Sequence, residues 1–160
     1  MTQILGNGRF HALVIALLLL TACGEQVARN DVGEVIAGGD IDVFDTKVGD
    51  CFNDTVFDAE VTDIPGVPCA EPHDNEIFAL YDTTVTSYPG EDELLESANT
   101  KCIASFDSYV GVTYDNSILD VFPLIPTLDS WKLLNDREII CVLYHLEQEK
   151  LTGSMHGSRI

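Results

Sequence analysis

The sequence predicts a small α+β domain in which an antiparallel sheet is covered by one main helix and clipped by disulfides. Short runs of β-branched and aromatic residues, broken by Asp, Asn, Gly and Pro, indicate strands and turns. One longer stretch, at about residues 91–110, has apolar residues at helical spacings of three and four. Four cysteines lie in the same part of the 160-residue chain, whose length suits one domain.

The first 22 residues have the features of a signal peptide. The apolar run Ala12–Leu20 follows Arg9 and ends in small residues. It is too short to span a bilayer, which takes about 20 apolar residues. A buried core helix is the alternative, but such a helix has a polar face and this run has none.

The segment Leu20-Thr21-Ala22-Cys23 resembles the lipobox of bacterial lipoproteins, in which the Cys thiol is diacylated and the chain is cut before it. Each buried acyl CH₂ contributes about 0.8 kcal/mol, so two chains anchor a protein stably where one does not. The resemblance implies a lipoprotein signal peptide over residues 1–22 and a lipid, such as palmitate, on Cys23. We expect a protein held in the cell membrane by this lipid and facing the extracytoplasmic side.

The charge is strongly negative. The chain has 8 Lys and Arg against 27 Asp and Glu, a net charge of −19, and removal of Arg9 with residues 1–22 leaves −20. Nucleic acid and anionic lipid are polyanions, so the charge disfavours both as direct ligands. The acidic residues are dispersed, which is typical of a solvated surface.

Three further segments divide the rest of the chain. Residues 23–42 contain four Gly from residue 24 onward, few large apolar residues and no clear period, so they predict a flexible tether. The folded domain is expected over 43–154. Residues 155–160 are expected to form a loose tail.

The helix at 91–110 is the clearest element. Glu91, Asp92 and Glu93 fall in its first turn, where the helix dipole favours acids, and Gly111 stands where the helix should stop. A weak Ca²⁺ site is the alternative for the three acids, but they lack the spacing of a calcium loop.

Strands are expected around this helix. Alternating runs between Val43 and Cys69 predict short strands with turns, and NEIFALYD at 75–82 is apolar on both faces. The segment 117–127 carries two prolines and suits a short edge strand. REIICVLYHL at 137–146 suits a central strand.

The cysteine count supports export. Lipidation of Cys23 leaves an even set of four, which outside the cytoplasm indicates disulfides. Four cysteines allow three pairings, and the spacing does not choose among them. We favour Cys51–Cys69, which flanks two strand-like runs, and Cys102–Cys141, which would tie the helix to a late strand. A zinc site from these thiols and His73 is the rival, but no C-x-x-C spacing occurs.

His73, Asp74 and Glu76 form the most distinctive polar stretch, CAEPHDNEIF. A carboxylate beside an imidazole can orient it and make it a base or a ligand. The structural alternative is a capped turn before the strand. Trp131 is the only tryptophan; it suits either a binding platform or a core position. Nucleophile-elbow, phosphate-loop and zinc-protease motifs are missing, so no cofactor or catalytic residue is predicted.

The ordered stretches resemble the septum-formation domain family of actinobacterial envelope proteins over about residues 47–154. They are VGDCFN, VPCAEPHDNEIFALYD, YPG, PT..SW, DR.IIC and LTGS. One departure is Asn135, which stands where Gly often precedes the Asp-Arg pair and which also tolerates turn geometry. The family's positions fall on Gly49, Asp50, Cys51, Cys69, Pro72, His73, Glu76, Pro89, Cys102, Phe106, Pro126, Trp131, Asp136, Arg137 and Cys141.

The resemblance implies a link to division or envelope growth and brings no established catalytic residue. We therefore expect a non-enzymatic, lipid-anchored module that binds an envelope or division protein not identified by the sequence. The alternative is a small-ligand-binding protein or hydrolase that uses His73 with Asp74 or Glu76.

Overall fold

A computed structural model describes residues 25–55 and 61–160. The expectations for residues 1–24, including lipidation of Cys23, lie outside the described residues. The elements are β1 (Ala28–Arg29), β2 (Val35–Ala37), β3 (Gly39–Asp42), a 3₁₀ turn (Val43–Asp45), β4 (Cys51–Phe52), β5 (Asp63–Val67), β6 (Asn75–Asp82), α1 (Glu91–Val110), a second 3₁₀ turn (Tyr114–Asn116), β7 (Leu119–Leu124), a π-helical turn (Ser130–Leu134) and β8 (Glu138–His145).

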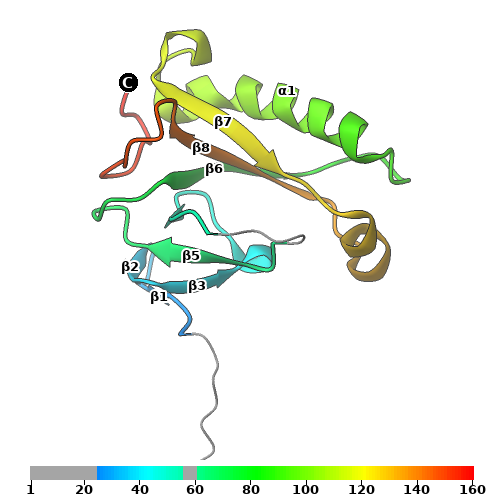
Figure 1. Cartoon of the computed structure of the whole chain (residues 1–160), viewed down its shortest axis with the longest axis horizontal. Coiled ribbons are helices and arrows are strands. Elements are labelled where there is room, and N and C mark those ends of the chain that lie inside the picture. Colours follow the sequence, from blue (N-terminus) through cyan, green and yellow to red (C-terminus); the bar gives the residue numbers. More distant parts are fainter. Residues whose placement is uncertain (1–24, 56–60) are drawn as a thin grey trace, which may run out of the picture.

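The strands form one six-stranded antiparallel sheet and a small two-stranded one. The large sheet has the order β3-β5-β4-β6-β8-β7, and β1 pairs with β2 in the small sheet. Figure 1 shows α1 lying across one face of the large sheet, over β7 and β8. The predicted α+β class is therefore confirmed. β8 lies between β6 and β7, and β7 is an edge strand, as the two prolines near its end predicted.

Helix α1 has the predicted bounds. Gly111 ends it at a φ of 85° and donates its N–H to the Asp107 carbonyl. The apolar stripe of the helix packs on the sheet, where Phe106 makes an edge contact with Phe78 at a centroid distance of 6.0 Å. The disulfide Cys102–Cys141 joins the helix to β8, and Cys51–Cys69 joins β4 to the turn after β5. Both are the pairs that we favoured.

The opposite face of the sheet has its own apolar cluster. Along β8, Ile139, Cys141 and Leu143 face the helix, while Ile140 and Val142 face the other way. The second cluster brings Ile140 and Val142 together with side chains of β3 and β5, which are not neighbours of β8 in the sheet. The sheet therefore curls over itself on this side instead of being covered by a helix.

The expected tether at 23–42 is wrong for the residues that the structure describes. β1, β2 and β3 occupy most of residues 28–42, and β3 pairs with β5. The glycines there permit close backbone contact: a Cβ on Gly39 would lie 2.3 Å from the carbonyl oxygen of Glu25. A Gly-rich segment without an apolar period can therefore form a strand when another chain segment crosses it.

The expected loose tail at 155–160 is also wrong. Met155 is buried, the Gly157 N–H donates to the Tyr109 carbonyl at 2.8 Å, and the Arg159 N–H donates to the Val110 carbonyl at 2.9 Å. The last carbonyls of a helix have no partner within it, so this segment satisfies the end of α1.

Both edges of the large sheet are occupied. The Ile118 carbonyl accepts from the Leu146 N–H, so every second residue after Ile118 directs its backbone N–H and C=O toward β8. The residues between them, Leu119, Val121 and Pro123, direct their backbone groups away from β8. The Leu119 N–H donates to Ser117 Oγ at 3.1 Å and the Val121 N–H to Asp120 Oδ1 at 2.8 Å. Pro123 has no N–H. The β7 edge thus offers few free donors to another strand.

The β3 edge is covered by the first described residues. The Asp40 N–H donates to the Glu25 carbonyl at 2.8 Å, and the Val27 N–H donates to the Asp40 carbonyl at 3.2 Å. Among residues 25–55 and 61–160, no helix is long and apolar enough to cross a membrane.

Candidate functional site

His73 lies in a packed turn. Its side chain is fully buried, its Nδ1 is 2.8 Å from the Glu71 carbonyl, and its backbone forms a bridge with Leu151. Its Nε2 has no hydrogen-bond partner among the described atoms. This position matches the structural alternative, in which the histidine holds the turn before β6.

Glu76 is fully buried and accepts three hydrogen bonds. Tyr109 OH and Ser154 Oγ donate to Oε1 at 2.7 and 2.5 Å, and the Met155 N–H donates to Oε2 at 2.6 Å. Burial and the neighbouring Glu76 carboxylate raise the pKa of Tyr109, so the phenol remains a donor. The carboxylate therefore ties α1 and the C-terminal segment to β6.

Asp74 lies near the surface with different partners. It accepts hydrogen bonds from Lys150 Nζ at 2.7 Å and from the Asp54 N–H at 2.8 Å. Burial alone would raise the pKa of Asp74, but these two donors lower it below its ordinary value. The three predicted residues His73, Asp74 and Glu76 thus have separate hydrogen-bond partners.

Trp131 lies in the first apolar cluster and is only 5% exposed. The guanidinium carbon of Arg137 lies 3.6 Å from the centroid of its ring, and Tyr88 makes an edge contact with it at 5.5 Å. Arg137 also donates to the carbonyls of Trp131 and Asp136. The buried tryptophan therefore holds Tyr88 and the 130–137 segment in place through these contacts.

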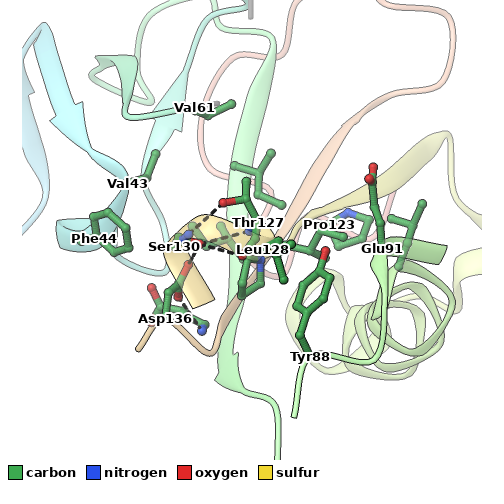
Figure 2. A pocket seen from close by; sticks show the side chains of 16 residues that line it. Val43, Phe44, Val61, Tyr88, Glu91, Pro123, Thr127, Leu128, Ser130 and Asp136 are labelled. Atoms are coloured by element: carbon green, nitrogen blue, oxygen red, sulfur yellow. Dashed lines mark hydrogen bonds between the residues drawn. The ribbon is translucent and has the colours of Figure 1, made fainter. Parts of the chain in front are cut away.

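Tyr88 and the 130–137 segment border a surface groove of about 470 Å³, which we call the β7 groove (Figure 2). One side comes from the turn after β3, another from the start of α1, and the floor from the end of β7, the segment after it and β8. Its lining is Val43, Phe44, Val61, Tyr88, Glu91, Leu95, Pro123, Leu124, Ile125, Pro126, Thr127, Leu128, Ser130, Asp136, Glu138 and Ile140.

Hydrogen bonds fix the central part of the β7 groove, as Figure 2 shows. Ser130 Oγ donates to Asp136 Oδ2 at 2.9 Å, and the Thr127 N–H donates to Ser130 Oγ at 3.0 Å. Ser130 begins the π-helical turn, which Asn135 closes at a φ of 57°. Turns of the π type often occur at functional sites, and Leu128, two residues before this turn, lines the groove with 42% of its surface exposed.

The β7 groove is acidic where it is not apolar. Its described lining has three carboxylates, from Glu91, Asp136 and Glu138, and no Lys or Arg. Asp136 is occupied by Ser130 and by the Glu138 N–H. Burial, followed by the charges of Asp82 and Asp136, raises the pKa of Glu138. Its carboxylate makes no hydrogen bond or ion pair with the described residues, so it is available to a cationic ligand.

A second cavity of about 810 Å³ lies between residues 32–36, residues 47–50, residues 68–70 and the residues Tyr109, Ser154 and His156. Asp50, which lines this cavity, forms an ion pair with Arg29 at 2.5 Å. Cys51, Cys69 and Glu76 lie close enough to share a metal, but the two sulfurs are bonded to each other. A disulfide lacks the thiolates that zinc requires, so this cluster does not fit a metal ion.

The β7 groove was not foreseen from the sequence. Its residues come from five separate segments, 43–44, 61, 88–95, 123–130 and 136–140, that the fold brings together. The only local signals were the prolines that end β7 and the exposed apolar residues Phe44 and Leu128, which a turn does not require.

Fold and site define a disulfide-clipped α+β domain that carries an apolar groove with an acidic rim. The sequence matches the family described as Septum formation over residues 21–158, and the chain belongs to that family. The match includes residues 25–42 and most of the C-terminal segment, in agreement with their place in the fold. Neither a curated protein nor a solved structure matches the chain.

Proposed function

We propose that this protein is a lipid-anchored extracytoplasmic component of the cell envelope and acts in septum formation as a non-catalytic interaction module. The observation that carries the proposal is the β7 groove. Membership of the Septum formation family supports the division role. Lipidation at Cys23 supplies the anchor and rests on the lipobox resemblance.

The β7 groove supports binding of a partner because it has the volume of a ligand site and a mostly apolar lining with a few polar groups. Phe44 at one side is 55% exposed, and Leu128 at the other is 42% exposed. By contrast, the predicted chemistry-bearing residues His73 and Glu76 are buried within the fold. This arrangement favours recognition over catalysis.

The disulfides support an extracytoplasmic location. Cys51–Cys69 and Cys102–Cys141 use all four cysteines among the described residues. Such bonds persist in oxidising compartments and are rare in the cytoplasm. Cys23 is then the one cysteine left for acylation.

The anchor is tested by growing the native host with radiolabelled palmitate. We expect label and an acyl mass on the wild-type chain, and neither on Cys23→Ser. The two disulfides keep the other sulfurs unreactive, which makes Cys23→Ser a specific control. An unlabelled wild-type chain, or equal labelling of both, would contradict the proposal.

The division role is tested by complementing a deletion strain and measuring septum spacing by microscopy. Wild type should restore normal spacing and Leu128→Glu should not, because a charge in the β7 groove disfavours an apolar ligand. Ile103→Glu is the matched control: Ile103 is 39% exposed and lies on the outer side of α1. Equal behaviour of the two variants would contradict a role for the groove.

A further inference from the structure

The folded part of the chain begins almost at the expected lipid. Glu25 already accepts a hydrogen bond from Asp40, and Gln26 forms a bridge with the same residue. Only Gly24 separates Cys23 from Glu25, and two extended residue steps span at most about 7 Å. A lipid on Cys23 would therefore hold the β3 edge at the headgroup layer, with no tether between them.

The β7 groove lies close to that point of attachment. From Asp40, β3 runs to Asp42 and continues into the turn whose Val43 and Phe44 line the groove. Three residues of strand cover about 10 Å. One wall of the β7 groove is thus held within reach of the membrane surface.

The charges of this region select the kind of partner. Glu91 and Glu138 line the β7 groove, and the charges of Asp82 and Asp136 act unfavourably on the Glu138 carboxylate. A Lys or Arg side chain of a partner would relieve this repulsion, whereas an acidic segment would add to it. Anionic lipid itself is excluded for the same reason.

The mode of binding follows from the closed sheet edges. A partner cannot readily extend the sheet at β7, because Ser117 and Asp120 occupy the outward donors of Leu119 and Val121. The partner must instead place side chains into the β7 groove, which accommodates a short peptide segment better than a folded surface.

We infer that the β7 groove binds the membrane-proximal extracytoplasmic segment of a membrane-spanning protein, a short apolar stretch that carries Lys or Arg. The inference rests on the proposed lipid anchor, because the anchor places the groove beside the membrane. Since both molecules are then held on one surface, a weak contact is sufficient for association.

The experiment is site-specific photo-crosslinking of the full chain in membranes of the native host. Leu128→p-benzoylphenylalanine reports on the β7 groove, and Ile103→p-benzoylphenylalanine is the control on α1. We expect groove crosslinks whose peptides, mapped by mass spectrometry, adjoin a membrane span and contain Lys or Arg. Adding Glu138→Gln should lower their yield about fivefold, the effect of one charge pair.

Several results would overturn the inference. They are crosslinks far from any membrane span, crosslinks to a second copy of this chain, equal yields at positions 128 and 103, or no groove crosslink at all. Palmitate labelling and complementation are scored on the same strains. A labelled, complementing chain without groove crosslinks therefore refutes the partner class alone, whereas an unlabelled chain refutes the anchor.

Discussion

The two faces of the large sheet are buried by different means. On one face α1 covers β6, β7 and β8, and the disulfide Cys102–Cys141 crosses between the layers. On the other face the sheet curls and packs β3 and β5 against β8, which leaves the β7 groove open at one end. We call these the helix face and the groove face.

The difference between the two faces indicates that the helix face stabilises the fold, whereas the groove face is suited to binding. The helix face holds a completed core with a disulfide and a satisfied buried carboxylate. The groove face exposes apolar side chains and the Glu138 carboxylate, which has no hydrogen bond or ion pair within residues 25–55 and 61–160, and a free-standing fold needs neither feature. Substitutions on the helix face should therefore change unfolding, and those on the groove face should change binding.

The largest expected effect is loss of the helix-face disulfide. The pair Cys102→Ala and Cys141→Ala opens a loop with a sequence separation of 39 residues. Such a loop predicts a loss of about 4 kcal/mol in the free energy of unfolding. The matched pair Cys51→Ala and Cys69→Ala, with a separation of 18, predicts a loss of about 3 kcal/mol. Urea unfolding followed by circular dichroism measures both, and a reversed order would contradict the comparison.

The next largest effect is expected at Glu76. Glu76→Ala leaves the Tyr109 hydroxyl, the Ser154 hydroxyl and the Met155 N–H without their acceptor in a buried place. We expect a loss of about 3 kcal/mol in the free energy of unfolding. Asp74→Ala, which removes the exposed pair with Lys150, should lose about 1 kcal/mol or less. Equal losses in the two variants would show that Glu76 is not a structural group.

Alkaline pH should weaken the fold through tyrosines that pack on the helix face. Burial and Glu76 raise the pKa of Tyr109, and the hydrogen bond to Asp120, followed by burial, raises the pKa of Tyr114 to about 12. A phenol with a raised pKa loses its proton first in the unfolded chain, near pH 10. The stability is thus present below about pH 10 and is lost as the pH rises toward 12.

Urea unfolding between pH 8 and 11, with phenolate absorbance as a second signal, measures this loss. Tyr109→Phe should flatten the dependence on pH, because it removes one of the titrating phenols. A wild-type stability that stays constant up to pH 11 would contradict the assignment.

The smallest effect on stability, and the sharpest contrast, is expected at Glu138. Its raised pKa means that the charged form is disfavoured in the fold, so Glu138→Gln should raise the free energy of unfolding at pH 7 by about 0.5 kcal/mol or less. The same change should weaken groove crosslinking, as argued above. Thermal unfolding of the full chain measures the first effect, and a clear destabilisation would assign Glu138 to the fold instead of the groove.

Local pattern was enough to predict the helix, its stop at Gly111, the interior position of β8 and the edge position of β7. These elements depend on apolar spacing or on proline, which act over a few residues. The strands at 28–42 were missed because their order depends on pairing with β5 and on crossing of Gly39 by Glu25, neither of which is local. The tail was missed for the same reason, since its partners are the end of α1 and Glu76.

For the candidate site, too, local sequence patterns were not enough where residues far apart in the chain meet. Sequence chemistry directed attention to His73 and Glu76, but burial assigns both to the fold. The β7 groove joins residues from Val43 to Ile140, which are brought together only by the curl of the sheet. A surface of this kind carries no contiguous motif.

The position of Ser154 and Met155 affects the moment at which folding can finish. Both donate to the buried Glu76 carboxylate, although they follow it in the chain by 78 and 79 residues. A nascent chain emerges from its N-terminus, so β6 and α1 exist well before these donors arrive. Until residues 154 and 155 have been added, the buried Glu76 carboxylate lacks two of its three donors, so the packing of α1 against β6 cannot be completed before that point.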